Sequence, residues 1–268
     1  MTYFLFYLLS SFLLSHYTDI YEGILIEVER LVGFLESVQR EDGRFSKSDF
    51  EDILVLSSLY SAERIAHPKS KIHEHFPKII RKADENGLFS QFKNSKDPKA
   101  RFKYYKMLIY TNSMTREELD TEVKKIDWKN QNDIELFAIA HETSSFAGVR
   151  YDFLCEKIEN FLERFVQNPN YLDLQKVYFI LQSLSHSTCD KFEIHSPFIF
   201  EIWRSIEKLE VQNLNFHLRC MYFDIVSQFR SINFEELNLF YDTLKKVRTP
   251  KEVAICIEAA VKTFYKRK

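Results

Sequence analysis

Apolar residues recur three and four positions apart through most of residues 132–209, and this spacing constrains the fold more than any other feature. In a helix of 3.6 residues per turn the spacing places apolar side chains on one face, whereas a strand alternates them at every second position. Short polar turns separate four such stretches. We therefore predict four consecutive amphipathic helices, each with its apolar face buried against its neighbours.

The predicted helix starts near Asn132, Leu172 and Gln212 recur at intervals of about forty residues, which is typical of stacked helical hairpins. The 268-residue chain also contains only 5 glycines and 6 prolines. These are too few for the turns of a β-sandwich or barrel, but they are enough to end helices. The sequence thus predicts an all-α fold, an α-α superhelix or solenoid of about a dozen antiparallel helices.

Four segments follow from composition. Residues 1–15 are uncharged and apolar, which is typical of a signal peptide, and a first core helix is the alternative. We expect helical hairpins over 16–84, an irregular projecting loop over the lysine-rich 85–100, and the helical-repeat superhelix over 101–268. If residues 1–15 are cleaved, the protein belongs to the secretory pathway, in the lumen of the endoplasmic reticulum. If they are retained, it is cytoplasmic.

Local signals mark several turns and helix starts. Gly43, in a polar turn, is expected to adopt a positive φ, and Ser48 or Asp49 to cap the helix that follows. Thr115 and Glu118 have the spacing of a capping box, in which each residue bonds to the backbone of the other.

The four cysteines lie far apart in apolar helical stretches and form no CxxC pair. Cysteine metal sites usually take two ligands from one tight turn, so we expect no metal. Buried free thiols are the simplest interpretation, and one or two disulfides are the alternative if the chain is secreted. The residues are Cys155, Cys189, Cys220 and Cys256.

Catalytic motifs are missing from the sequence: it has no HExxH, GxSxG, P-loop or GxGxxG pattern. His67, His73 and His75 are close in sequence, but His73 and His75 are two positions apart and would point to different faces of a helix. We interpret them as residues of a surface helix. The protein is expected to be no enzyme, with no catalytic residue, no cofactor, no metal and no small-molecule substrate.

One local stretch is strongly basic, although 37 basic and 39 acidic residues leave a net charge of only −2. Aromatic residues interleave its cations, a composition that suits contact with RNA or ribosomal phosphate. A solvated loop beside a helix is the simpler interpretation. The candidate contacts are Lys93, Lys96, Lys99, Arg101, Lys103 and Lys106.

Two stretches carry a resemblance to a known family. FSKSDFEDILVLSSLYS, residues 45–61, combines a phenylalanine, a polar spacer and a Leu-Ser-Ser-Leu run. IAHETSSFAGVRYDFLCEKIENFLERF, residues 139–165, closes one helix on small hydroxylated residues and opens another with a Glu-Lys-Ile-Glu texture. In both, the chain resembles the helical lumenal domain of ribophorin II, an accessory subunit of the oligosaccharyltransferase complex. Its pattern of helix-packing residues is also similar to that of helical-repeat proteins associated with ribosomes or RNA.

The function expected from the sequence is therefore that of a non-catalytic scaffold or accessory subunit. The ribophorin resemblance implies a protein partner in a larger complex of the secretory pathway. The alternative is a cytosolic or organellar helical-repeat protein that binds the ribosome or RNA through the basic stretch.

Overall fold

All regular secondary structure in the described part of the chain is helical. The computed structural model describes residues 2–169, 171–182, 187–189, 192 and 196–265. These contain 13 α-helices, two short 3-10 helices (Trp128–Asn130 and Val211–Asn213) and no strand. The prediction of an all-α fold of about a dozen antiparallel helices is confirmed.

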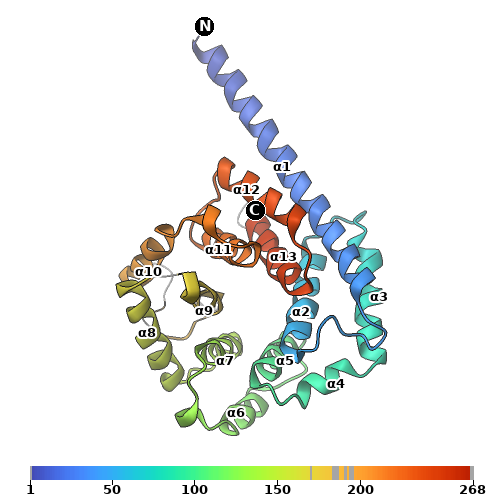
Figure 1. Ribbon diagram of the computed structural model, residues 1–268, viewed down its shortest axis with the longest axis vertical. Helices are drawn as coiled ribbons and strands as arrows, with labels where there is room; N and C mark the ends of the chain where they lie inside the picture. The colour runs from blue at the N-terminus through green and yellow to red at the C-terminus, as the bar shows by residue number, and fades with distance from the viewer. Residues whose placement is uncertain (1, 170, 183–186, 190–191, 193–195, 266–268) are drawn as a thin grey trace.

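Six helices form an inner ring (Figure 1). Each inner helix packs on the next one, and the last packs on the first, so the superhelix closes on itself. In order around the ring they are α2 (Asp49–Ile65), α5 (Pro98–Tyr110), α7 (Ile134–Phe146), α9 (Tyr171–Gln182), α11 (Phe216–Phe229) and α13 (Pro250–Tyr265).

The remaining helices surround this ring (Figure 1). Their apolar faces pack inward, while their polar faces form the exterior, as amphipathic helices require. They are α1 (Thr2–Val38), α3 (Ile72–Glu85), α4 (Leu88–Lys93), α6 (Arg116–Lys124), α8 (Asp152–Gln167), α10 (Pro197–Glu207) and α12 (Phe234–Lys246).

Side-chain caps explain where many helices begin. The predicted caps are confirmed: Ser48 accepts a hydrogen bond from the Glu51 N–H, and Thr115 and Glu118 form the capping box. Asn233 and Glu236 form a second box at α12. These caps satisfy N–H groups that the first helical turn leaves without partners, which is why the sequence alone reveals them.

The turn between α1 and α2 depends on Gly43 and Asp52. Gly43 has a φ of +80°, as predicted, and a Cβ there would lie 2.9 Å from the Lys82 carbonyl oxygen. Asp52 is fully buried and accepts 2.9 Å hydrogen bonds from the N–H groups of Phe45 and Ser46. Arg44 pairs with the same carboxylate at 2.8 Å. These contacts therefore hold the turn at residues 44–46 against the first turn of α2.

The expectation of a projecting irregular loop over 85–100 is wrong for its central part. Residues Leu88–Lys93 form α4, and both Leu88 and Phe92 are fully buried. These two side chains, four positions apart, lie on one face of the short helix. A helix of one and a half turns is too short for its period to stand out among the surrounding lysines.

The first helix is longer than expected. The expected boundary between residues 15 and 16 is not a break between elements, since α1 runs without interruption over Thr2–Val38. Its N-terminal half extends away from the ring (Figure 1). Cleavage of residues 1–15 stays a prediction. Within the described chain, no helix has the length and apolar character needed to cross a membrane.

Burial of apolar side chains on α13, which packs on α2, α11 and α1, should contribute strongly to stability. Ile257 on α13 is fully buried, whereas Ile26 on α1 is 64% exposed. Ile257→Ala is expected to lower the free energy of unfolding by about 2–5 kcal/mol, because it removes buried methyl groups and leaves a cavity. The matched change Ile26→Ala should cost under about 0.5 kcal/mol. Urea unfolding measures both, and equal losses would contradict the proposed packing.

Candidate functional site: the central cavity

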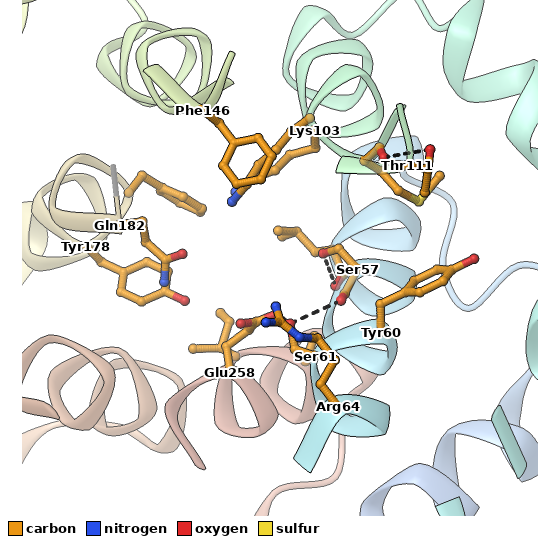
Figure 2. Close-up of a pocket in the computed structure, with 16 residues that line it drawn as sticks. Ser57, Tyr60, Ser61, Arg64, Lys103, Thr111, Phe146, Tyr178, Gln182 and Glu258 are labelled. Atoms are coloured by element: carbon orange, nitrogen blue, oxygen red, sulfur yellow. Dashed lines mark hydrogen bonds between the residues drawn. The ribbon is translucent and has the colours of Figure 1, made fainter. Parts of the chain in front are cut away.

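A cavity of about 340 Å³ lies at the centre of the ring. Its lining side chains converge from α2, α5, α7, α9 and α13 (Figure 2). One part of the wall is apolar: Leu54, Met107, Phe146, Phe179, Ala254 and Ile255. The other part carries charged and polar groups, among them Arg64, Lys103, Lys106, Tyr178, Gln182 and Glu258. A concave, mostly apolar site with a few polar groups is typical of small-molecule binding.

Two lysines that line the cavity, both on α5, share one buried carboxylate of α7. The Nζ of Lys103 lies 2.6 Å from Glu142 Oε2, and the Nζ of Lys106 lies 2.5 Å from Glu142 Oε1. Glu142 is 1% exposed. Burial alone would raise its pKa, but the two ammonium groups outweigh this and hold the pKa well below its usual range. Glu142 is therefore ionised, and it holds α5 against α7.

A second charged group lies between α9, α11 and α13. Asp224 is fully buried, 2.5 Å from the Nζ of Lys262, and accepts a 2.5 Å hydrogen bond from the amide of Gln182. Tyr178 is buried beside it, and burial together with the charges of Asp224 and Glu258 raises the Tyr178 pKa well above its usual value. Its phenol therefore stays protonated near neutral pH.

Glu258 of α13 faces α2 across the ring closure. It accepts a 2.8 Å hydrogen bond from the Ser61 hydroxyl, and the Arg64 side chain extends toward it (Figure 2). Burial raises the Glu258 pKa, which the nearby Lys262 charge opposes. All six inner helices thus contribute a polar side chain to the core around the cavity.

The basic stretch does not form one exposed surface. Lys93 and Lys96 are exposed, but Lys103 and Lys106 point inward to Glu142. Lys99 is half-buried and lies 3.0 Å from Asp133 and 3.3 Å from Glu135, and Arg101 donates to the Ser95 carbonyl. The expectation that these cations lie on a loop and an exposed helical face is wrong for Lys103. The reason is that residues 103 and 106 lie on the inward face of α5.

The three neighbouring histidines do not converge on one point. His73 is paired with Glu63 at 3.4 Å, and its Nε2 lies 3.1 Å from the His67 carbonyl oxygen. His75 instead contacts Glu36 on α1. Their interpretation as residues at a helix surface agrees with these separate contacts.

The cysteines form two disulfides, so the interpretation as free thiols is wrong. Cys155 of α8 is bonded to Cys189, which follows α9, and Cys220 of α11 is bonded to Cys256 of α13. The pairing brings together residues 34 and 36 positions apart, which only the tertiary packing determines.

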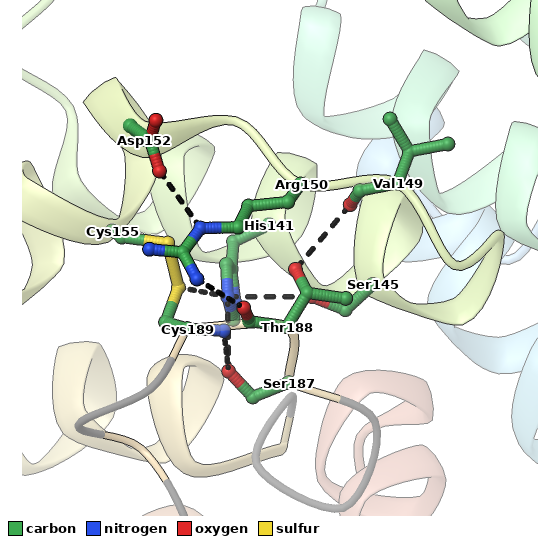
Figure 3. The surroundings of a disulfide bond; sticks show 9 residues. All are labelled: His141, Ser145, Val149, Arg150, Asp152, Cys155, Ser187, Thr188 and Cys189. Carbon is green, nitrogen blue, oxygen red and sulfur yellow. Dashed lines mark hydrogen bonds and ion pairs between the residues drawn. A yellow bond between two sulfur atoms is a disulfide. The ribbon is translucent and has the colours of Figure 1, made fainter.

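His141 lies against the first disulfide (Figure 3), with its Nε2 3.0 Å from Cys189 Sγ and 3.3 Å from the Ser145 and Ser187 hydroxyls. The three potential ligand atoms of His141, Cys155 and Cys189 lie within 4.8 Å of one another. Metals bind thiolates, however, and here both sulfurs are joined in a disulfide. Sequence reasoning missed this cluster because its members come from three separate segments.

Loss of the Glu142 carboxylate charge should strongly destabilise the fold. Glu142→Gln leaves the buried ammonium of Lys103 and the partly buried ammonium of Lys106 without their counterion, so we expect a loss of about 3–5 kcal/mol in unfolding free energy. Asp242, which is exposed and 3.4 Å from Lys245, provides the control. Asp242→Asn should cost no more than about 1 kcal/mol. Chemical denaturation measures both variants, and a comparably small loss for Glu142→Gln would contradict the buried network.

Stability should also fall on mild acidification. Burial lowers the pKa values of His141 and His217 from 6.5 to about 4. The unfolded chain therefore binds protons between pH 6.5 and 4 that the native state does not, and the histidines' contribution to stability, complete above 6.5, is lost as pH falls toward 4. His141→Gln should flatten the slope of unfolding free energy against pH by up to about 1.4 kcal/mol per pH unit. An unchanged slope would contradict a buried neutral imidazole.

Comparison with known proteins finds no match at any level. No family model matches the chain, and neither the curated proteins nor the solved structures include a similar one.

Proposed function

We propose that the protein is a non-catalytic helical accessory subunit of the secretory pathway, with its place in the lumen of the endoplasmic reticulum. The observation that carries this proposal is that all four cysteines are paired in two disulfides. Structural disulfides form and persist in oxidising compartments, whereas cytosolic thiols are kept reduced.

The positions of the two bonds support a structural role. Cys220 and Cys256 join α11 to α13, next to the contact that closes the ring, and both residues are fully buried. Cys155 and Cys189 are at most 9% exposed. Buried disulfides between neighbouring helices restrict the unfolded chain and so stabilise the fold, which is their usual use in secreted proteins.

The resemblance to ribophorin II supplies the proposed partner, the oligosaccharyltransferase complex. A non-catalytic role agrees with the cavity, whose described lining contains one carboxylate, Glu258, and no histidine. Binding to RNA has less support, because several cations of the basic stretch are engaged by acidic neighbours. A protein partner is therefore the proposal, and ribosome or RNA binding is an alternative outcome of the test.

Thiol counting tests the compartment. The protein is isolated from its own cells, alkylated at once under denaturing conditions without a reductant, and analysed by mass spectrometry. We expect no alkylated cysteine, because oxidative folding pairs Cys155 with Cys189 and Cys220 with Cys256. The control sample, reduced first, should carry four labels. Four labels without reduction would place the protein in a reducing compartment and overturn the proposal.

Association tests the partner. We expect the tagged chain to co-purify in stoichiometric amounts with the catalytic subunit of the oligosaccharyltransferase in mild detergent. Lys93→Glu with Lys96→Glu removes the two exposed cations of the basic stretch and should leave this association unchanged, because a protein partner does not depend on phosphate contacts. Co-sedimentation with ribosomes that the double variant abolishes would instead support the alternative.

A further inference from the structure

Lys106 provides a cation at the edge of the apolar part of the central cavity. It keeps 31% of its side chain exposed although its ammonium is paired with Glu142. An ammonium has three N–H donors, and within the described residues Glu142 accepts from one of them. Lys106 therefore has donors available to a ligand that enters the cavity.

Glu142 is the carboxylate that pairs with this ammonium. Lys103 and Lys106 share it, so neither lysine has a carboxylate to itself at ion-pair distance within the described residues. Across the cavity, Glu258 accepts a hydrogen bond from Ser61, and burial raises its pKa (Figure 2). The remaining N–H donors of Lys106 can pair with one anionic group of a ligand.

The apolar part of the cavity lining indicates what the rest of the ligand is like. The Nζ of Lys106 lies over the Phe146 ring, 5.7 Å from the ring centroid. Met107, Phe179 and Ile255 also belong to the apolar part of the lining. A volume of about 340 Å³ is at the lower end of the range for small-molecule sites, which suits a small ligand.

From this geometry we propose that the central cavity binds a small monocarboxylate with an apolar body, of the class of medium-chain fatty acids. The carboxylate pairs with Lys106, and the chain packs against Phe146, Phe179 and Ile255. This site is independent of the disulfides and of the proposed partner complex.

Calorimetric titration of the full chain at neutral pH with decanoate tests the proposal, with decanol and decylamine as neutral and cationic probes of the same length. The wild-type protein should bind decanoate about ten-fold more tightly than decanol, because the carboxylate gains a charge-assisted hydrogen bond. It should not bind decylamine. Absence of decanoate binding, or equal binding of decanoate and decanol, overturns the proposal.

Lys106→Met keeps the apolar stem and removes the charge, so it should reduce decanoate affinity about ten-fold and leave decanol affinity unchanged. The exposed Lys96→Met is the matched control and should bind as the wild type does. Ala254→Phe fills the cavity without altering a charge and should abolish binding of both probes. Unaltered decanoate affinity in folded Lys106→Met or in Ala254→Phe overturns the site, and Ala254→Phe decides alone if Lys106→Met fails to fold.

Discussion

Packing of α13 against α2 is the contact on which the rest of this structure depends. It joins the C-terminal helix to the first inner helix, and Ile257 and Leu56 are fully buried on these two helices. Burial of such side chains stabilises by about 1.5–3 kcal/mol each. Without this contact the same helices would form an open superhelix with two ends, and no enclosed centre would exist.

Closure of the ring also explains the unusual core. Inner helices must present one face to the centre, and α5, α7, α11 and α13 place Lys103, Glu142, Asp224 and Lys262 around it. Buried ions are costly unless they are paired, and the 2.5–2.6 Å contacts show close pairing. A core of paired charges is less favourable in free energy than an apolar core of the same volume, because each charge loses its hydration. Its presence here coincides with a cavity whose wall is partly cationic.

The compartment and the cavity rest on different observations. Paired cysteines support an oxidising environment and a structural subunit, whereas Lys106 and the apolar wall support a ligand. A scaffold can hold a small molecule at its centre without acting on it chemically. On these two proposals, a partner would contact the exterior of the ring and a ligand would occupy its central cavity.

Local interactions let the sequence alone predict most of the helices, although α4 was missed. Thr115 caps α6 and Asn233 caps α12 through residues three positions away, and helical periodicity needs only nearby residues. The tertiary structure decided everything that joins distant segments: the inward direction of Lys103, the pairing of Cys155 with Cys189, and the cavity itself. Lys103 and Lys106, three positions apart, have the spacing of a solvated helix face. Only the packing of α5 on α7 shows that both pair with Glu142. The physical reason is that helix formation is set within a few residues, whereas the direction of each face depends on how all the helices pack.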